Sequence, residues 1–247
     1  MGQERHFLPL DPCPLPHEKE FAMVKIAVSG SKGKMGLRIL ALAKEDSEFN
    51  IAAEFDIDGN AEESIGACDC LIEFTAPKAT MEHLDLCVNL KKAIVIGTTG
   101  LSDADKAKIK EASKGIPVVL SPNMSVGVNL LFKLVEESAK VLGSEYEVNI
   151  LEAHHTEKKD APSGTAKEMA RIVRDVRDTD TDVPIDSIRE DEIVGEHTIT
   201  FESDVDVLEI THSAKTRDIF VQGALKAAKF IAGKKHGLFT MKDVLAL

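Results

Sequence analysis

Between residues 24 and 120, short apolar runs alternate with amphipathic helical patterns, and no other feature of the sequence constrains the fold as strongly. Strands that alternate with helices over this length predict a parallel sheet covered by helices on both faces. We therefore expect an α/β domain with a doubly wound sheet. The predicted strands are Val24–Ser29, Phe49–Phe55, Cys70–Thr75, Ala93–Ile96 and Val118–Leu120, and helices are predicted at Lys78–Val88 and Ser102–Lys114.

A glycine-containing turn follows the first predicted strand and leads into a helical pattern. In a strand–turn–helix unit of this kind, the pyrophosphate of a dinucleotide lies on the helix N-terminus. Gly33 and Gly36 fit the last two glycines of the usual fingerprint, but Ser31 stands at its first position. Glycine turns before helices are common, so the pattern needs its context to indicate a Rossmann-like domain. The turn residues expected to contact the cofactor are Gly30, Ser31, Lys32, Gly33, Lys34 and Met35.

The second predicted strand ends at Asp56, an acid at the position where a ribose-hydroxyl acceptor is expected in such units. The alternative is a plain turn aspartate beside Asp58 and Gly59. Ligands of open α/β sheets bind at the carboxyl ends of the strands, so later strand ends are expected to complete the cofactor site. These are Gly97, Thr98 and Thr99 after the fourth strand, and Ser121, Pro122, Asn123 and Met124 after the fifth.

The pattern changes at Ser125, after which the βαβ alternation stops. We expect an α+β segment over residues 125–216, with helices at Val128–Leu142 and Thr165–Val176 and a strand at Tyr146–Leu151. Three further runs, Ile188–Arg189, His197–Phe201 and Val207–Ile210, are predicted to be antiparallel strands. The chain then continues with an amphipathic helix, Arg217–Ile231, and a last helical piece, Leu238–Leu245.

The span from Glu152 to Ala166 gathers two histidines, two lysines and a Ser-Gly-Thr turn before the Thr165–Val176 helix. Ser163 is a good N-cap candidate for that helix. A helix N-terminus and a lysine both favour a bound anion, and a histidine can move a proton near neutral pH. The span therefore predicts a site for a carboxylate or phosphate, although a solvated charged loop with an ordinary N-cap is the alternative.

Charge and cysteine content limit the partners. The net charge of -12 argues against nucleic acid, since phosphate backbones need a positive surface. No apolar run reaches membrane-spanning length, and the cysteines (Cys13, Cys68, Cys70 and Cys87) have no zinc-ligand spacing. We expect a reduced cytoplasmic protein without a metal. Residues 1–22 have four prolines and no periodicity, so we expect a disordered, dispensable tail before Met23.

The sequence Glu-Ala-His-His-x-x-Lys-x-Asp-Ala-Pro-Ser-Gly-Thr-Ala, residues 152–166, resembles the signature of the 4-hydroxy-tetrahydrodipicolinate reductase (dihydrodipicolinate reductase) family. Gly97-Thr98-Thr99-Gly100, Asn123–Asn129, Gly195–Thr198 and Leu208–His212 extend the resemblance over residues 23–247. The chain differs from the family pattern in loops. It is compact around residues 56–68 and 178–190, and Glu190-Asp191 replaces the usual glycine after the strand arginine.

The resemblance implies NAD(P)H-dependent reduction of a cyclic dicarboxylate in the diaminopimelate route of lysine biosynthesis. It implies two catalytic residues, His154 as proton donor and Lys158, rather than Lys159, as the cation that holds or helps activate the substrate. His155, Ser163, Gly164 and Thr165 are the further substrate-binding candidates, although His155 could simply bond a backbone group. His83, His197, His212 and Arg217 have weaker claims, and Asp160 is interpreted as a turn-former.

The family architecture also implies two domains: residues 23–124 completed by 217–247 for the dinucleotide, and residues 125–216 for substrate and assembly into a homotetramer. NADH is expected to be favoured over NADPH, because the charge of Asp56 repels a 2′-phosphate and Ile57 follows it, while Lys32 and Lys34 soften the preference. Two alternatives stay open from the residues. One is another nicotinamide enzyme acting on a different imine or an α-substituted acid, and the other is a nucleotide sensor without catalysis.

Overall fold

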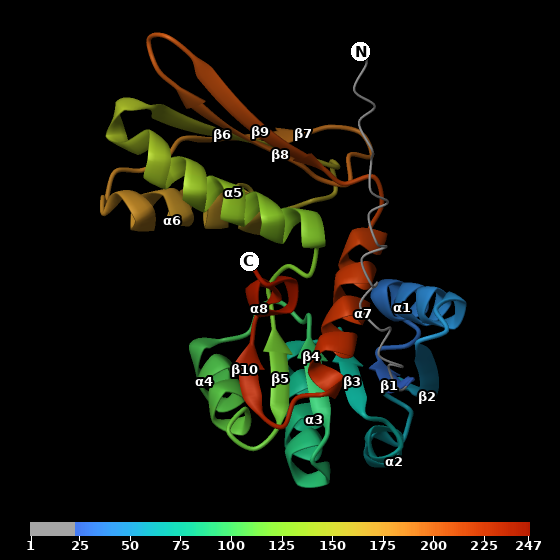
Figure 1. Cartoon of the computed structure of the whole chain (residues 1–247). Helices are drawn as coiled ribbons and strands as arrows, with labels where there is room; N and C mark the ends of the chain where they lie inside the picture. The colour runs from blue at the N-terminus through green and yellow to red at the C-terminus, as the bar shows by residue number, and fades with distance from the viewer. Residues whose placement is uncertain (1–22) are drawn as a thin grey trace, which may run out of the picture.

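A computed structural model describes residues 23–247, and in it two sheets divide the chain (Figure 1). The predicted tail, residues 1–22, and Cys13 lie outside the described residues. The larger sheet is parallel throughout, with strand order β10-β5-β4-β3-β1-β2. Its strands are β1 (Val24–Ser29), β2 (Phe49–Phe55), β3 (Cys70–Glu73), β4 (Ala93–Ile96), β5 (Pro117–Leu120) and β10 (Gly237–Phe239). The predicted doubly wound sheet is confirmed.

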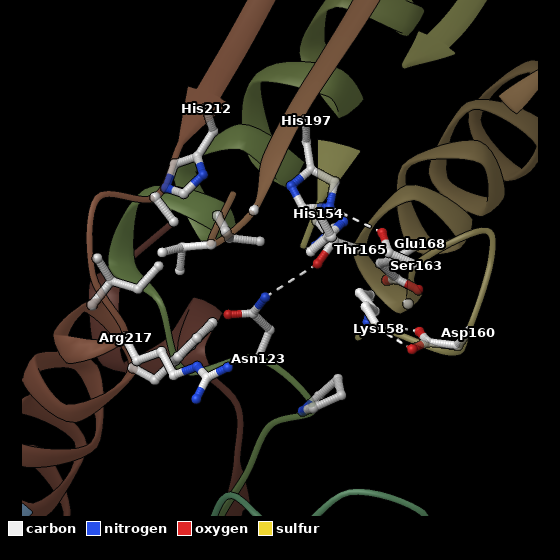
Figure 2. Close-up of a pocket in the computed structure, with 18 of the residues that line it drawn as sticks. Asn123, His154, Lys158, Asp160, Ser163, Thr165, Glu168, His197, His212 and Arg217 are labelled. Atoms are coloured by element: carbon white, nitrogen blue, oxygen red, sulfur yellow. Dashed lines mark hydrogen bonds and ion pairs between the residues drawn. The ribbon is translucent and has the colours of Figure 1, made fainter. Parts of the chain in front are cut away.

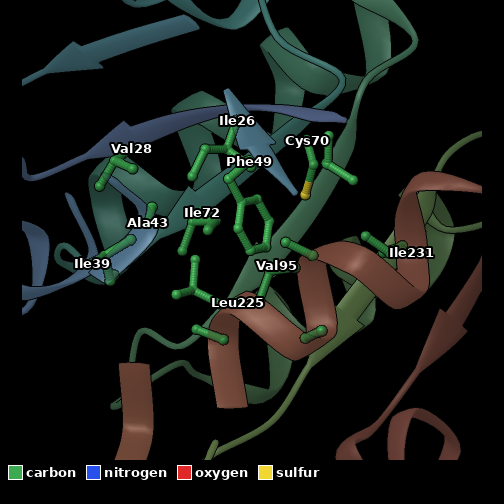
Figure 3. Close-up of a cluster of buried hydrophobic side chains, with 14 of the residues drawn as sticks. Ile26, Val28, Ile39, Ala43, Phe49, Cys70, Ile72, Val95, Leu225 and Ile231 are labelled. Atoms are coloured by element: carbon green, nitrogen blue, oxygen red, sulfur yellow. The ribbon is translucent and has the colours of Figure 1, made fainter. Parts of the chain in front are cut away.

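Helices cover both faces of this sheet because alternate strand residues point to opposite sides. Ile26, Ile72 and Val95 pack against α1 and α7 on one face (Figure 3), and Ala27, Leu71 and Ile94 pack against α2, α3 and α4 on the other. Each fully buried Ile or Leu contributes roughly 1.5–3 kcal/mol. The helices are α1 (Lys34–Glu45), α2 (Ala61–Gly66), α3 (Pro77–Leu90), α4 (Asp103–Ala112), α7 (Asp218–Ala232) and α8 (Met241–Leu245).

The smaller sheet is mixed and has the order β7-β6-β8-β9. Helices α5 (Val126–Leu142) and α6 (Gly164–Arg177) pack on one of its faces around Phe132, Ile150 and Phe201. Its strands are β6 (Glu147–His154), β7 (Ile185–Arg189), β8 (Glu196–Glu202) and β9 (Val207–Ser213). The prediction that β7 is antiparallel was wrong. It pairs parallel to β6, with Ala153 opposite Ile188, because α6 carries the chain back to the same end of the sheet, as a parallel crossover requires.

The last segment was also predicted incorrectly in part. Residues 238–245 were expected to be helical, but Gly237–Phe239 forms β10 and only Met241–Leu245 forms α8. The Gly237 backbone N–H donates to the Ser113 carbonyl, and Leu238 pairs with Val118 at the edge of the sheet. A three-residue strand is too short to show a period of two. The short helix α2 was not predicted at all.

The mixed sheet and its helices lie beyond the carboxyl ends of the parallel strands (Figure 1). The chain passes from β5 to α5 through residues 121–125 and returns from β9 to α7 near Arg217. Both passages therefore lie between the two sheets, where ligands of parallel α/β sheets bind. No helix within residues 23–247 has the length and apolarity needed to cross a membrane.

Candidate active site

The turn after β1 is built around close backbone contacts. Gly30 has φ +65°, and a Cβ at Gly36 would lie 2.2 Å from the Gly30 carbonyl oxygen, so neither position accepts a side chain without a shift. Gly33 is the N-cap of α1, and no side chain among the described residues caps that helix. Its first N–H groups are therefore free for an anion. Ser31 is buried, whereas Lys32 and Lys34 are exposed and Met35 packs against the core.

A cavity of about 530 Å³ lies beside this turn, lined by Gly30, Asp56, Ile57 and His83 among others. Asp56 Oδ2 accepts from the Lys32 backbone N–H at 3.1 Å, and Oδ1 accepts from the Ile57 N–H at 2.9 Å. These two bonds lower the pKa of Asp56 and keep it ionised. Open lone pairs remain on both oxygens, so the carboxylate can accept from ribose hydroxyls.

The strand-end candidates have unequal access to a ligand. Thr98 is buried, and its hydroxyl already bonds Thr80 at 2.8 Å and the Thr75 backbone N–H at 3.2 Å. Met124 packs in the core, and a Cβ at Gly97 would lie 2.2 Å from the Phe74 ring. Ser121 donates to the Asn123 carbonyl at 2.7 Å. Thr99, Pro122 and Asn123 differ from these, since they line a second, larger cavity.

This larger cavity, of about 710 Å³, lies between the two sheets (Figure 2). One wall comes from the strand ends of the parallel sheet and the other from the span that begins at the end of β6. It brings together all six substrate-site candidates, which are His154, His155, Lys158, Ser163, Gly164 and Thr165. Three of the predicted cofactor residues, Thr99, Pro122 and Asn123, therefore share one cavity with the predicted substrate residues, whereas Gly30 and Asp56 line the smaller cavity.

His154 ends β6 and is only 8% exposed. Its Nδ1 is hydrogen-bonded to Glu152 Oε2, and its Nε2 is the ring nitrogen left for a ligand. Gly195 adjoins that nitrogen, since a Cβ there would lie 3.0 Å from it. Burial lowers the pKa of His154 below its usual value, and the bond to Glu152 opposes that shift. A bound anion would raise the pKa and favour a proton on the ring.

Lys158 and His155 occupy the loop after β6. Lys158 Nζ donates to both oxygens of Asp160 at 2.8 Å, so Asp160 is the ion-pair partner of this lysine as well as a loop residue. The Lys158 side chain is 22% exposed and faces the cavity. His155 is half-buried, and its backbone N–H donates to the Ile193 carbonyl at 2.7 Å. Lys159 is exposed.

Ser163 is the N-cap of α6, as predicted. Its Oγ accepts from the Ala166 N–H at 3.2 Å and is 2.9 Å from His197 Nε2. Thr165 Oγ1 accepts from Asn123 Nδ2 at 3.3 Å (Figure 2), a hydrogen bond across the cavity from the segment after β5 to the start of α6. The helix N-terminus thus faces the cavity with a hydroxyl at each side of Gly164, an arrangement suited to a carboxylate.

Two partners of these residues, the buried Glu152 and the partly buried Arg189, were missed from the sequence. Glu152 is fully buried, and Arg189 donates to both of its oxygens at 2.9 and 2.7 Å. Burial would raise the pKa of Glu152, but the hydrogen bonds from its neighbours, led by Arg189, lower it to about 2. The spacing of Glu152 and His154 on one strand was a usable signal, because residues two apart share a face. His197, His212 and Arg217, which had weaker claims, also line the cavity.

Two family models match almost the whole of residues 23–247. The model "Dihydrodipicolinate reductase, N-terminus" matches residues 24–124, and the model "Dihydrodipicolinate reductase, C-terminus" matches residues 127–245. A 4-hydroxy-tetrahydrodipicolinate reductase of Geotalea uraniireducens (strain Rf4) is 41% identical over 266 residues, covering 91% of this chain and 100% of that protein.

Two solved structures share the fold. The dipicolinate-bound dihydrodipicolinate reductase from Paenisporosarcina sp. TG-14 superposes with a TM-score of 0.79 at 21% identity, over 90% of this chain and 100% of that one. GenD2 from gentamicin A biosynthesis, in complex with NAD, has a TM-score of 0.60 at 10% identity, over 94% and 93%. At these identities the likeness concerns architecture alone.

Proposed function

This chain belongs to the dihydrodipicolinate reductase family, and we propose that it reduces 4-hydroxy-tetrahydrodipicolinate to tetrahydrodipicolinate, with loss of water, using a reduced nicotinamide dinucleotide. One observation carries the proposal. A single cavity joins strand ends of the parallel sheet to a histidine, a lysine and the N-terminus of α6. Those are the groups that a hydride transfer to an unsaturated dicarboxylate requires beside a dinucleotide.

The residues present fit a dinucleotide. The tight turn from Gly30 to Gly36, the uncapped start of α1 and the ionised Asp56 suit a pyrophosphate and a ribose. When bound, the nicotinamide supplies the hydride. We propose that residues 23–124 and 217–247 hold the cofactor, whereas residues 125–216 hold the substrate. NADH is the favoured form, because Asp56 repels a 2′-phosphate, and NADPH is also used, because Lys32 and Lys34 soften this preference.

The chain's own residues bind the two carboxylates and manage one proton. Lys158 contributes a positive charge and the Ser163-Gly164-Thr165 turn contributes N–H and hydroxyl donors, with His155 beside them. His154 gives a proton from Nε2 to the substrate as electron density builds up there. Asp160 holds Lys158 in place before the substrate arrives.

The open face of the mixed sheet supports an assembly proposal. Leu151, Ile188 and Val207 are 40%, 41% and 53% exposed and share one face of this sheet, whose other face packs on α5 and α6. We propose that these open faces meet in a homotetramer. Size-exclusion chromatography with light scattering gives the mass, and a monomer at assay concentration would contradict this assignment.

The decisive test of the function is NADH oxidation with enzymatically generated 4-hydroxy-tetrahydrodipicolinate. We expect turnover that depends on both reactants. Binding of NADH without turnover would favour a nucleotide sensor. Turnover of a different imino acid, with none of this substrate, would favour another nicotinamide enzyme.

A further inference from the structure

We propose that Glu152 is a positioning residue that fixes which ring nitrogen of His154 faces the substrate, and that Arg189 holds Glu152 for this task. The inference rests on the proposed role of His154 as proton donor. It adds a requirement that the function alone does not contain, namely that the carboxylate beneath the histidine must be ionised and correctly oriented.

The first step is the set of donors around one buried carboxylate. Glu152 Oε1 accepts from Arg189 Nη2 at 2.7 Å and from the Ser163 backbone N–H at 3.2 Å. Oε2 accepts from Arg189 Nη1 at 2.9 Å and is bonded to His154 Nδ1. Guanidinium and backbone N–H groups can only donate. Both oxygens must therefore be acceptors, which agrees with an ionised Glu152.

An ionised carboxylate forces the histidine tautomer. Since Oε2 can only accept, His154 Nδ1 must carry hydrogen, and the substrate-facing nitrogen is Nε2. In the neutral ring Nε2 is bare, so it receives a proton to form the imidazolium and releases it again during turnover. The negative charge of Glu152 stabilises that imidazolium.

Other charges around His154 make the carboxylate important. Four charged or titratable residues surround His154. Glu152 is on the same strand, Lys158 on the following loop and Arg189 on β7. His197 is on β8, and its ring centroid is 5.0 Å from that of His154. His212 on β9 lies behind His197. Two of these groups are cationic and oppose a protonated His154, whereas Glu152 alone favours it.

The Glu152 carboxylate also holds the Ser163-Gly164-Thr165 turn, which we propose binds a substrate carboxylate and call the anion-binding turn. It accepts from the Ser163 N–H, and Arg189 Nη2 donates to the Asp160 carbonyl at 2.6 Å. The Glu152–Arg189 pair therefore holds three parts of the site in place: His154, the Ser163–Thr165 turn and the loop that carries Lys158. Glu152 does not line the cavity, so it acts through its neighbours and not by contact with substrate.

Glu152→Gln is the informative variant. Its single carbonyl oxygen is best placed at the Oε1 position, where two donors converge, which turns its amide toward His154 Nδ1. That amide donates, so the histidine must accept through Nδ1 and carry its hydrogen on Nε2. We expect ¹⁵N NMR of histidine-labelled protein to show the Nδ1–H form of His154 in the wild type and the Nε2–H form in the variant.

Turnover gives the second readout. We expect kcat of Glu152→Gln to fall at least roughly 10²-fold, as when a histidine of a catalytic triad takes the wrong tautomer. The alkaline fall of kcat should also move to lower pH. Arg189→Lys keeps a positive charge but cannot donate to both oxygens of Glu152 at once. It should therefore retain the Nδ1–H tautomer of His154 and lose less kcat than Glu152→Gln. Glu147→Gln, on the exposed part of the same strand, is the control and should change neither readout.

The outcomes separate the two proposals. An unchanged His154 tautomer together with near wild-type kcat in a folded Glu152→Gln protein would overturn the positioning role. If Glu152→Gln does not fold, the wild-type protein still tests the proposal. A His154 ring in the wild type with its hydrogen on Nε2 would also overturn the positioning role. Full activity of His154→Gln would instead contradict the proton-donor role, while the Nδ1–H tautomer of the wild type would still stand.

Discussion

Asp56 and Lys32 are joined by a hydrogen bond of 3.1 Å from the Lys32 backbone N–H to Asp56 Oδ2. This bond ties the acid that follows β2 to the turn that follows β1. The two elements of the proposed cofactor site therefore keep one geometry, and the Asp56 carboxylate stays ionised. Lys32 itself points to Asp58, with Nζ 3.3 Å from Oδ2, and its charge is partly satisfied there.

Cofactor choice should respond to the residue after Asp56. Ile57 is 94% exposed and lines the cavity, so Ile57→Arg would add a cation without disturbing the core. We expect kcat/KM for NADPH relative to NADH to rise at least tenfold, and wild type to favour NADH modestly. Steady-state kinetics with both cofactors measure the ratio. A wild-type preference for NADPH would contradict the assignment.

The two domains should close during turnover. Cofactor candidates lie before Ser125 and the anion-binding turn after it, and hydride transfer needs near contact between the reacting atoms. Among the hydrogen bonds that cross the cavity is the one from Asn123 to Thr165, at 3.3 Å. Solution scattering with NADH plus pyridine-2,6-dicarboxylate should give a smaller radius of gyration than the free protein. Identical profiles would mean a preformed site.

Lys158 should act mainly through substrate affinity. Removing a charge-assisted bond costs about 1.5–3 kcal/mol, so Lys158→Ala should raise KM for the substrate roughly 10- to 150-fold. Lys159→Ala removes the neighbouring exposed lysine and is the matched control, expected to keep wild-type KM. Equal effects of the two variants would show a general charge effect and no specific contact.

Acid stability should depend on His197. Burial lowers its pKa from 6.5 to about 4. Between these two pH values the His197 ring is therefore mostly neutral in the folded state and mostly protonated in the unfolded chain. Its contribution to stability is present above pH 6.5 and is lost as the pH falls toward 4, by an amount on the order of 3 kcal/mol. Burial lowers the pKa of His154 and His212 too, which adds to the same slope.

Thermal melts between pH 7 and pH 4 test this prediction. His197→Gln should lose less stability on acidification than the wild type, even though it starts lower at pH 7 because its contact with Ser163 changes. In the same window Glu152 stays ionised, since its pKa is about 2. Parallel melting curves for the two proteins would show that other groups cause the acid sensitivity.

The repeating part of the fold was accessible from the sequence because its signals are local. Val24–Ser29 and Phe49–Phe55 were predicted with the observed bounds, since apolar runs next to glycine turns mark buried parallel strands. Two features depended on pairing between distant residues. The direction of β7 follows from its pairing with β6, in which Ile185 lies opposite Ile150, a residue 35 positions earlier in the chain. The strand β10 forms only because β5 offers it a free sheet edge.

The candidate site divides in the same way. His154, Lys158 and Ser163 stand in one contiguous motif and could be identified together. Arg189 could not, because its two bonds to Glu152 form only after β7 aligns with β6. Residues that hold a catalytic group from another strand leave no periodic pattern of their own. Their role becomes visible when the buried carboxylate is followed to its donors.

The most direct measurement for the account as a whole is kcat of His154→Gln with NADH and 4-hydroxy-tetrahydrodipicolinate, with folding checked by a thermal melt. Loss of the acid that quenches the developing charge should lower kcat roughly 10²–10⁴-fold, with a smaller change in KM. Near wild-type kcat in the folded variant would contradict the assignment and move the proton donor to Lys158 or bound water.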